Sequence, residues 1–326
     1  MDISKNLTES SGIPGTKLEI KKKAGNAVRT MAKSMLKAKI GQKALPYMFV
    51  APAMIIFLLF VIWPVIYMVY ISFFDWNMIA DMEFVGIKNY IKMLGSKDFR
   101  MVLGNTFRFM LMMVPTTMIL SLIIAIYLKK NTRVNRLLQN IMFMPNIVSL
   151  VSISFIWMWM MDEDRGLFNF VLGLFHLNPV NWLGDPKVAM FSLVLVNVWK
   201  NLGYYVLIFV AALQGIPGYL YEAAALDHAR PLSVFFKITL PMLSPTLFFL
   251  TLTGIIGSFK TFESVSLMTA GGPADSTNTL VYELYQQGFV YYKTGYASAM
   301  GVVLMVIVGI MTLVYFAVLQ KKVHYQ

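Results

Sequence analysis

Six long apolar stretches constrain what this chain can fold into, because each is long enough to cross a membrane. They cover about residues 47–73, 106–128, 138–161, 188–213, 240–259 and 297–319. A helix needs roughly 20 apolar residues to cross about 30 Å of hydrocarbon. A helix also pairs its backbone groups internally, as a bilayer requires. The sequence therefore predicts an all-α membrane protein with six transmembrane helices.

The composition favours a membrane protein without catalytic chemistry of its own. Of 326 residues, 58% are hydrophobic and 13% are charged, whereas about 25% of the residues of a soluble domain are charged. The chain has no cysteine, which excludes disulfides, thiolate metal sites and a cysteine nucleophile. The sequence contains no clustered metal ligands, catalytic triad or Gly-x-x-x-x-Gly-Lys-Ser/Thr phosphate loop. We therefore expect no metal, no cofactor and no enzymatic activity in this chain.

The basic residues predict how the chain crosses the membrane. Both tails and the loops on their side carry 18 Lys or Arg, while the three opposite loops carry eight, with eleven Asp or Glu. The positive-inside rule then places both termini in the cytoplasm. The chain divides into a basic tail (1–44), a transmembrane domain (45–320) and a C-terminal tail (321–326). We expect the basic tail to contact anionic membrane lipid and not nucleic acid.

The loop between the fourth and fifth stretches, about 214–240, has an unusual composition for a cytoplasmic connection. Residues 221–226 are rich in Ala, Glu and Leu, which favours a short helix. Arg230-Pro231 marks a turn, and Pro231 is well placed to start a second short helix. The small alanines leave a face that another protein can approach closely. Glu222 and Asp227 supply charges for such a contact.

This loop resembles the Glu-Ala-Ala signature of permeases of ABC importers. The matching residues are Glu222, Ala223, Ala224, Asp227, Ala229, Phe235, Ile238 and Pro241. His228 departs from the pattern, which usually has glycine there; histidine enters the left-handed region at some cost. The resemblance implies the type I ABC importer permease fold. It also implies that the loop inserts into a cleft on a separate ATPase dimer, which binds ATP and Mg.

A second stretch resembles the carbohydrate-uptake branch of these permeases, which includes maltose and glycerol-phosphate types. It begins at Leu267 and contains Gly271-Gly272-Pro273, which by itself indicates only a turn. Residues 84–90 and 105–106 are similar to that branch as well. The resemblance implies that the Gly271–Pro273 loop faces an extracytoplasmic solute-binding protein. It implies import of a sugar, taken as an oligosaccharide, across the plasma (inner) membrane of a prokaryote. An anionic solute, such as a glycerol phosphate derivative or an acidic saccharide, is the alternative.

Polar residues inside the apolar stretches are candidates for the substrate pathway, because polar groups in a membrane are costly. Five are singled out: Asn146, Asn197, Lys200, Asn201 and Ser258. They either line a translocation cavity or form hydrogen bonds between helices. Lys200 pairs with a carboxylate, binds an anionic sugar or lies near a water-filled cavity, and the sequence leaves these three roles open.

A stand-alone secondary transporter or channel is the less favoured alternative. The chain shows neither a selectivity-filter sequence nor the repeated halves of a twelve-span transporter. Six spans in one chain enclose at most half of a pathway. The sequence therefore predicts a second permease, and the resemblance implies that it is a different but related subunit.

Overall fold

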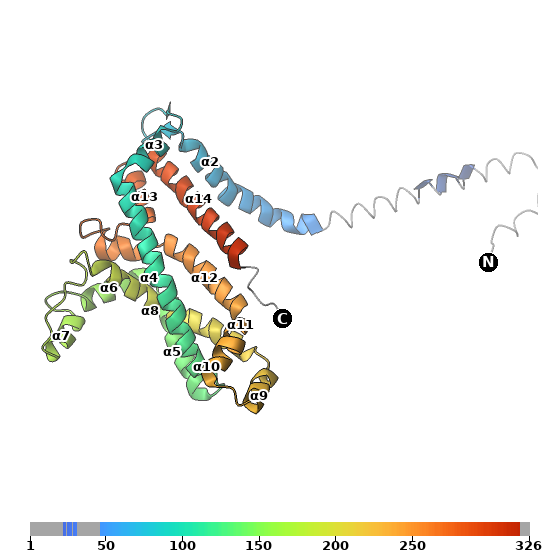
Figure 1. Ribbon diagram of the computed structural model, residues 1–326. Helices are drawn as coiled ribbons and strands as arrows, with labels where there is room; N and C mark the ends of the chain where they lie inside the picture. Colours follow the sequence, from blue (N-terminus) through green and yellow to red (C-terminus); the bar gives the residue numbers. More distant parts are fainter. Residues whose placement is uncertain (1–21, 24, 28, 31–45, 320–326) are drawn as a thin grey trace, which may run out of the picture. The chain divides into compact units, whose positions relative to one another are not determined.

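The computed structural model describes residues 22–23, 25–27, 29–30 and 46–319, and its regular structure is almost entirely helical (Figure 1). The chain forms two compact units, residues 1–67 and 68–326. The predicted tails, 1–44 and 321–326, lie outside the described residues, except for the few helical positions between 22 and 30. Residues 46–71 form one long helix that contains the π-helical segment η1 (Leu58–Ile62) and continues as α2 (Trp63–Ile71).

The second unit contains all of the remaining elements. In chain order they are β1 (Phe74–Asp75), β2 (Glu83–Phe84), α3 (Lys88–Gly95), α4 (Lys97–Leu128), α5 (Arg133–Ile147), α6 (Leu150–Met160), α7 (Leu167–Leu174), α8 (Ala189–Gln214), α9 (Gly218–Leu226), α10 (Pro231–Val234), η2 (Phe235–Thr239), α11 (Leu240–Met242), α12 (Ser244–Phe259), η3 (Val265–Thr269), α13 (Leu280–Tyr285), η4 (Gln286–Val290) and α14 (Thr294–Leu319).

Among the described residues, four helices are long and apolar enough to cross a membrane: 46–71, 97–128, 189–214 and 294–317. Two helix pairs pass the same test only together, because each is sharply bent. The pair α5–α6 bends by 98°, and the pair 231–242 with α12 bends by 66°. The described residues therefore contain four to six candidate spans, which confirms a helical membrane protein.

The structure differs from the predicted spans in three places. Helix α4 begins at Lys97 and not near 106, because the Ser96 hydroxyl accepts hydrogen bonds from the amides of Asp98 and Phe99 and caps the helix. The third stretch is broken where Val148 and Ser149 take an extended conformation. The short ribbon β1–β2, with Phe74 opposite Phe84, was not indicated by the sequence.

The core of the second unit lies where α8 packs against α4, α5 and α12. Val206 and Phe209 of α8 are fully buried in it, together with Leu250 of α12. Gly203 of α8 allows α5 to approach closely, because a Cβ at this position would overlap the Met142 carbonyl group. Close approach through small residues is the usual way in which helices associate in membranes, where lipid is as apolar as the side chains.

We predict that Gly203→Ala destabilises the protein by about 1–3 kcal/mol, because the added methyl group must push α8 away from the α5 backbone. Thermal unfolding of the purified protein in detergent measures this change. Gly104→Ala is the matched control, because Gly104 lies in α4 with open space around its Cβ position and alanine favours a helix over glycine. Equal melting temperatures for the two variants would contradict the close α5–α8 packing.

Candidate functional site

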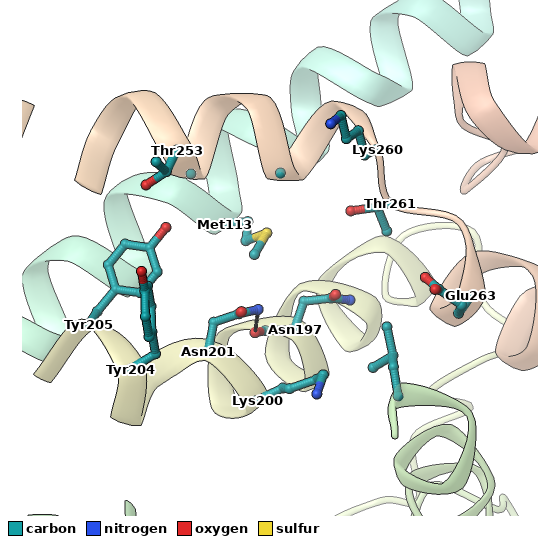
Figure 2. A pocket seen from close by; sticks show the side chains of 13 residues that line it. Met113, Asn197, Lys200, Asn201, Tyr204, Tyr205, Thr253, Lys260, Thr261 and Glu263 are labelled. Atoms are coloured by element: carbon teal, nitrogen blue, oxygen red, sulfur yellow. Dashed lines mark hydrogen bonds between the residues drawn. The ribbon is translucent and has the colours of Figure 1, made fainter. Parts of the chain in front are cut away.

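A cavity of about 290 Å³ lies between α8 and α12 and is backed by α4 (Figure 2). The structure brings together here three of the five polar residues expected in the pathway, Asn197, Lys200 and Asn201. The full lining is Met113, Leu150, Asn197, Lys200, Asn201, Tyr204, Tyr205, Thr253, Gly254, Gly257, Lys260, Thr261 and Glu263.

Helix α8 supplies the polar wall of the cavity. Residues 197, 200, 201, 204 and 205 are spaced by three or four along the chain, so the helical period places them on one face. Tyr204 is 37% exposed, and its ring lies beside the ring of Tyr205 with centroids 5.8 Å apart. This wall therefore combines amide groups, phenol hydroxyls and aromatic surface.

Helix α12 supplies the opposite wall, which is open because two of its residues are glycines. Thr253, Gly254 and Gly257 lie on one face of α12. A Cβ at Gly254 would come 2.8 Å from the Tyr205 hydroxyl, whereas the space around Gly257 is empty to 4 Å. Where α12 ends, Lys260, Thr261 and Glu263 border the cavity (Figure 2).

The two asparagines of α8 are held by hydrogen bonds of different kinds. The buried Asn197 donates through Nδ2 to the Leu193 carbonyl at 2.8 Å and to the Ser264 hydroxyl at 3.0 Å. The bond to Ser264 links α8 to the residue that directly precedes η3. Asn201 donates to the Asn197 carbonyl at 2.8 Å within the same helix. Asn197 thus connects two helices and also borders the cavity.

Lys200 caps the broken third stretch. Its ammonium group donates to three backbone carbonyls at the end of α5, those of Pro145 (3.4 Å), Asn146 (3.2 Å) and Val148 (2.8 Å). These carbonyls have no partner in the next helical turn, because α5 stops at Ile147. The positive charge also faces the negative end of the α5 dipole. The sequence left three roles open for Lys200. The structure shows a role that is not among them, hydrogen bonding to main-chain carbonyls.

The other two residues expected in the pathway lie outside the lining of this cavity. Ser258 is buried and donates to the Ile255 carbonyl of its own helix at 2.7 Å. Asn146 is half-buried and contributes its main-chain carbonyl to Lys200. Sequence reasoning did not single out Thr253 or Met113, although Thr253, Gly254 and Gly257 form a small, weakly polar face at helical spacing.

The loop 214–240, which resembles the Glu-Ala-Ala signature, forms two short helices, α9 and α10, joined by a tight turn. His228 has a φ of +49°, the left-handed conformation that the usual glycine would adopt freely. Its amide donates to the Ala225 carbonyl, and that of Ala229 donates to the Ala224 carbonyl, which closes α9. Pro231 is the first residue of α10. Glu222, Ala223, Asp227 and Ala229 are exposed, Ala224 is buried, and Phe235 and Pro241 are half-buried.

The loop at Gly271–Pro273 is a compact turn. Gly271 has a φ of +80°, and a Cβ at this position would come 2.9 Å from the Tyr282 ring. The Thr277 hydroxyl donates to the Gly272 carbonyl at 2.5 Å, and the Thr277 amide donates to the Gly271 carbonyl at 3.2 Å.

In the part of the chain that the structure describes, no three Asp, Glu or His side chains come close enough to hold a metal ion.

Comparison with known proteins agrees with this architecture. The chain is 34% identical over 284 residues to the sn-glycerol-3-phosphate transport system permease protein UgpA of Salmonella typhimurium (strain LT2), which covers 86% of this chain and 96% of the relative. UgpA of Escherichia coli (strain UTI89) has the same identity and coverage.

Two solved structures share the fold. A bacterial ABC transporter that imports the acidic polysaccharide alginate matches with a TM-score of 0.76 and 22% identity, over 88% of this chain and 98% of its own. The bacterial alginate ABC transporter in complex with its alginate pentasaccharide-bound periplasmic protein matches with a TM-score of 0.75 and 21% identity, over 85% and 94%. Residues 117–325 match the family described as the binding-protein-dependent transport system inner membrane component. This match covers more than half of the chain, which therefore belongs to that family of inner-membrane permeases.

Proposed function

We propose that this permease carries a sugar-like solute through the cavity between α8 and α12. The single observation that carries the proposal is the lining of that cavity. It combines the hydroxyls of Tyr204, Tyr205, Thr253 and Thr261 with the amide of Asn201 and the exposed aromatic surface of Tyr204. Hydrogen-bonding side chains beside aromatic surface are what recognition of a polyhydroxylated solute requires. An oligosaccharide would make such contacts one sugar unit at a time.

A second candidate cargo is an anionic solute of the same kind, such as a glycerol phosphate derivative or an acidic saccharide. Lys260 favours it, because this exposed cation borders the cavity. The named relatives and structural neighbours serve glycerol-3-phosphate and alginate, both anionic. Glu263 borders the same cavity and opposes this preference by its charge.

We further propose that both bent helix pairs act as single spans, which gives six in all within residues 45–320. The asymmetry of basic residues supports cytoplasmic termini. On this topology the loop 214–240 faces the cytoplasm, where its exposed Glu222, Ala223, Asp227 and Ala229 contact an ATPase dimer. Phe235 and Pro241 lie in the segment that returns to the membrane. The ATPase, and not this chain, would bind ATP and Mg.

Two further partners complete the proposed importer. Helix α14 exposes a row of large apolar side chains, including Ile310, Leu313 and Val314, for lipid or for a second, related permease. One chain lines only part of a pathway, so we expect a second permease, and the family resemblance favours a different but related subunit and hence a heterodimer. The turn at Gly271–Pro273 lies between the fifth and sixth spans, on the side from which a solute-binding protein delivers cargo.

We predict that Gly257→Leu lowers cargo uptake at least tenfold, because the new side chain would occupy part of the cavity. The substitution should be tolerated structurally, since no atom lies within 4 Å of the added Cβ. Uptake by the reconstituted transporter measures the effect, and co-purification of the partner subunits shows that assembly is intact. Gly104→Leu is the matched control, since Gly104 also has open space but lies outside the cavity. Equal uptake by the two variants would place the pathway elsewhere.

We predict that Glu222→Lys uncouples transport from ATP hydrolysis or prevents assembly with the ATPase, because it reverses an exposed charge on α9. The measurements are pull-down of the ATPase and cargo-stimulated ATP hydrolysis. Glu163→Lys is the control, an identical change at an exposed residue of a loop proposed to lie on the opposite side. Normal assembly and coupling in the Glu222 variant would count against the proposed contact.

We predict that Lys200→Met lowers the free energy of unfolding by about 1–3 kcal/mol, because it leaves three carbonyls at the end of α5 without a donor. Thermal unfolding in detergent measures this loss, and Lys200→Arg should recover part of it. If Lys200→Met left the stability unchanged but raised the KM for anionic cargo, Lys200 would instead bind the negative charge of the cargo.

A further inference from the structure

A second polar cavity, of about 300 Å³, lies at the beginning of α4 and shares no lining residue with the cavity between α8 and α12. It is bordered by the first turn of α4, by the loop after η3, and by α13 and η4. We name it the acidic pocket and define it by Asp98, Asp275, Asn278, Glu283, Gln286 and Gln287.

The acidic pocket carries a concentrated negative charge. Asp98, Asp275 and Glu283 line it, and no Lys, Arg or His is among the described residues that do so. Glu283 is fixed in place, because Asn278 donates to its Oε2 at 2.8 Å and Gln287 donates to its Oε1 at 2.7 Å. A carboxylate oriented by two amides is ready to accept a further donor without reorganising.

Asn278 points independently to a missing ligand. This side chain is 6% exposed and lines the pocket, and its Oδ1 has no hydrogen-bond partner within the described part of the chain. Buried polar atoms are paired in the great majority of cases, so an unpaired acceptor needs an explanation. Its amide nitrogen donates to Glu283, and its Oδ1 can accept a hydrogen bond from an N–H or O–H group that enters the pocket.

The geometry favours an organic cation over a metal ion. A calcium ion needs six to eight oxygens at 2.3–2.6 Å, whereas no three Asp, Glu or His side chains of the described residues are close enough to hold a metal. Carboxylates spread around a cavity of about 300 Å³ suit a larger group with several donors. A guanidinium group has five N–H donors in a planar fork that matches carboxylates.

We propose that the acidic pocket receives an arginine side chain of the solute-binding protein when that protein docks. This inference rests on the topology of the proposed function, which places the start of α4 and the segment between the fifth and sixth spans outside the cytoplasm. Asp98 and Asp275, which line the pocket, are exposed, so a water-soluble partner can reach them. Charge complementarity of this kind steers docking and fixes its orientation.

The test is binding of the purified, cargo-loaded solute-binding protein to the complete transporter in nanodiscs. The variant is Asp98→Lys with Asp275→Lys, two exposed residues whose side-chain carboxylates form no hydrogen bond or ion pair with another described residue. We expect the Kd to rise about tenfold or more at low salt, with basal ATP hydrolysis unchanged. Reversing the charge of one arginine on the docking face of the binding protein should restore the affinity of this variant. Asp81→Lys is the control, at an exposed carboxylate of another loop on the same side.

Each other outcome contradicts the proposal in a distinct way. A Kd within twofold of the wild type would exclude docking at the acidic pocket. Loss of wild-type binding in EDTA, restored by Ca²⁺, would identify a cation site, and loss of the second permease from the purified variant would identify a contact between permeases. If the wild-type transporter itself ignores the binding protein, the proposed function fails and not this inference alone.

Discussion

A helix that ends leaves its last carbonyl groups without a partner in the next turn, and the structure depends on how those at the end of α5 are paired. The break between α5 and α6 leaves the last carbonyls of α5 without helical partners, and the Lys200 ammonium group donates hydrogen bonds to three carbonyls there. Leaving buried backbone groups without a hydrogen-bond partner costs about 1–3 kcal/mol. Lys200 therefore fixes the 98° bend, and the bend in turn holds Leu150 at the edge of the central cavity.

Small residues determine where helices touch and where space remains. Gly203 lets α8 approach the α5 backbone, which brings Lys200 within reach of the carbonyls that it caps. Gly254 admits the Tyr205 hydroxyl beside α12, while Gly257 leaves the opposite wall open. The same residue type thus closes one helix interface and opens another. The cavity between α8 and α12 is a consequence of this placement, because larger side chains on α12 would fill it.

The sequence predicted the helical membrane class well, since length and hydrophobicity alone determine whether a segment can span a bilayer. It also predicted the two short helices of the loop 214–240, whose alanines, Arg230 and Pro231 act locally. It did not predict the break at Val148, because Lys200, which stabilises it, is 52 residues away. Thr253 escaped notice for a related reason. A single threonine in an apolar helix gains meaning only when the tyrosines of α8 are known to face it.

The loop 214–240 and the cavity between α8 and α12 are connected directly along the chain. The loop 214–240 joins the end of α8 to the start of the pair that continues as α12, so both walls of the cavity emerge from it. Within the loop, the Tyr221 hydroxyl bonds to that of Thr239 at 3.1 Å. The loop also contacts the residue after α4, because the Lys129 ammonium lies 5.3 Å from the Tyr221 ring. At 1.5 Å per residue, Asn201 lies about 20 Å along α8 from Gln214. If the loop were displaced, α8 would carry the displacement to Asn201, while on the other side it would have to pass the 66° bend before α12 to reach Thr253. Movement at one surface would therefore change the separation of the cavity walls without any additional element.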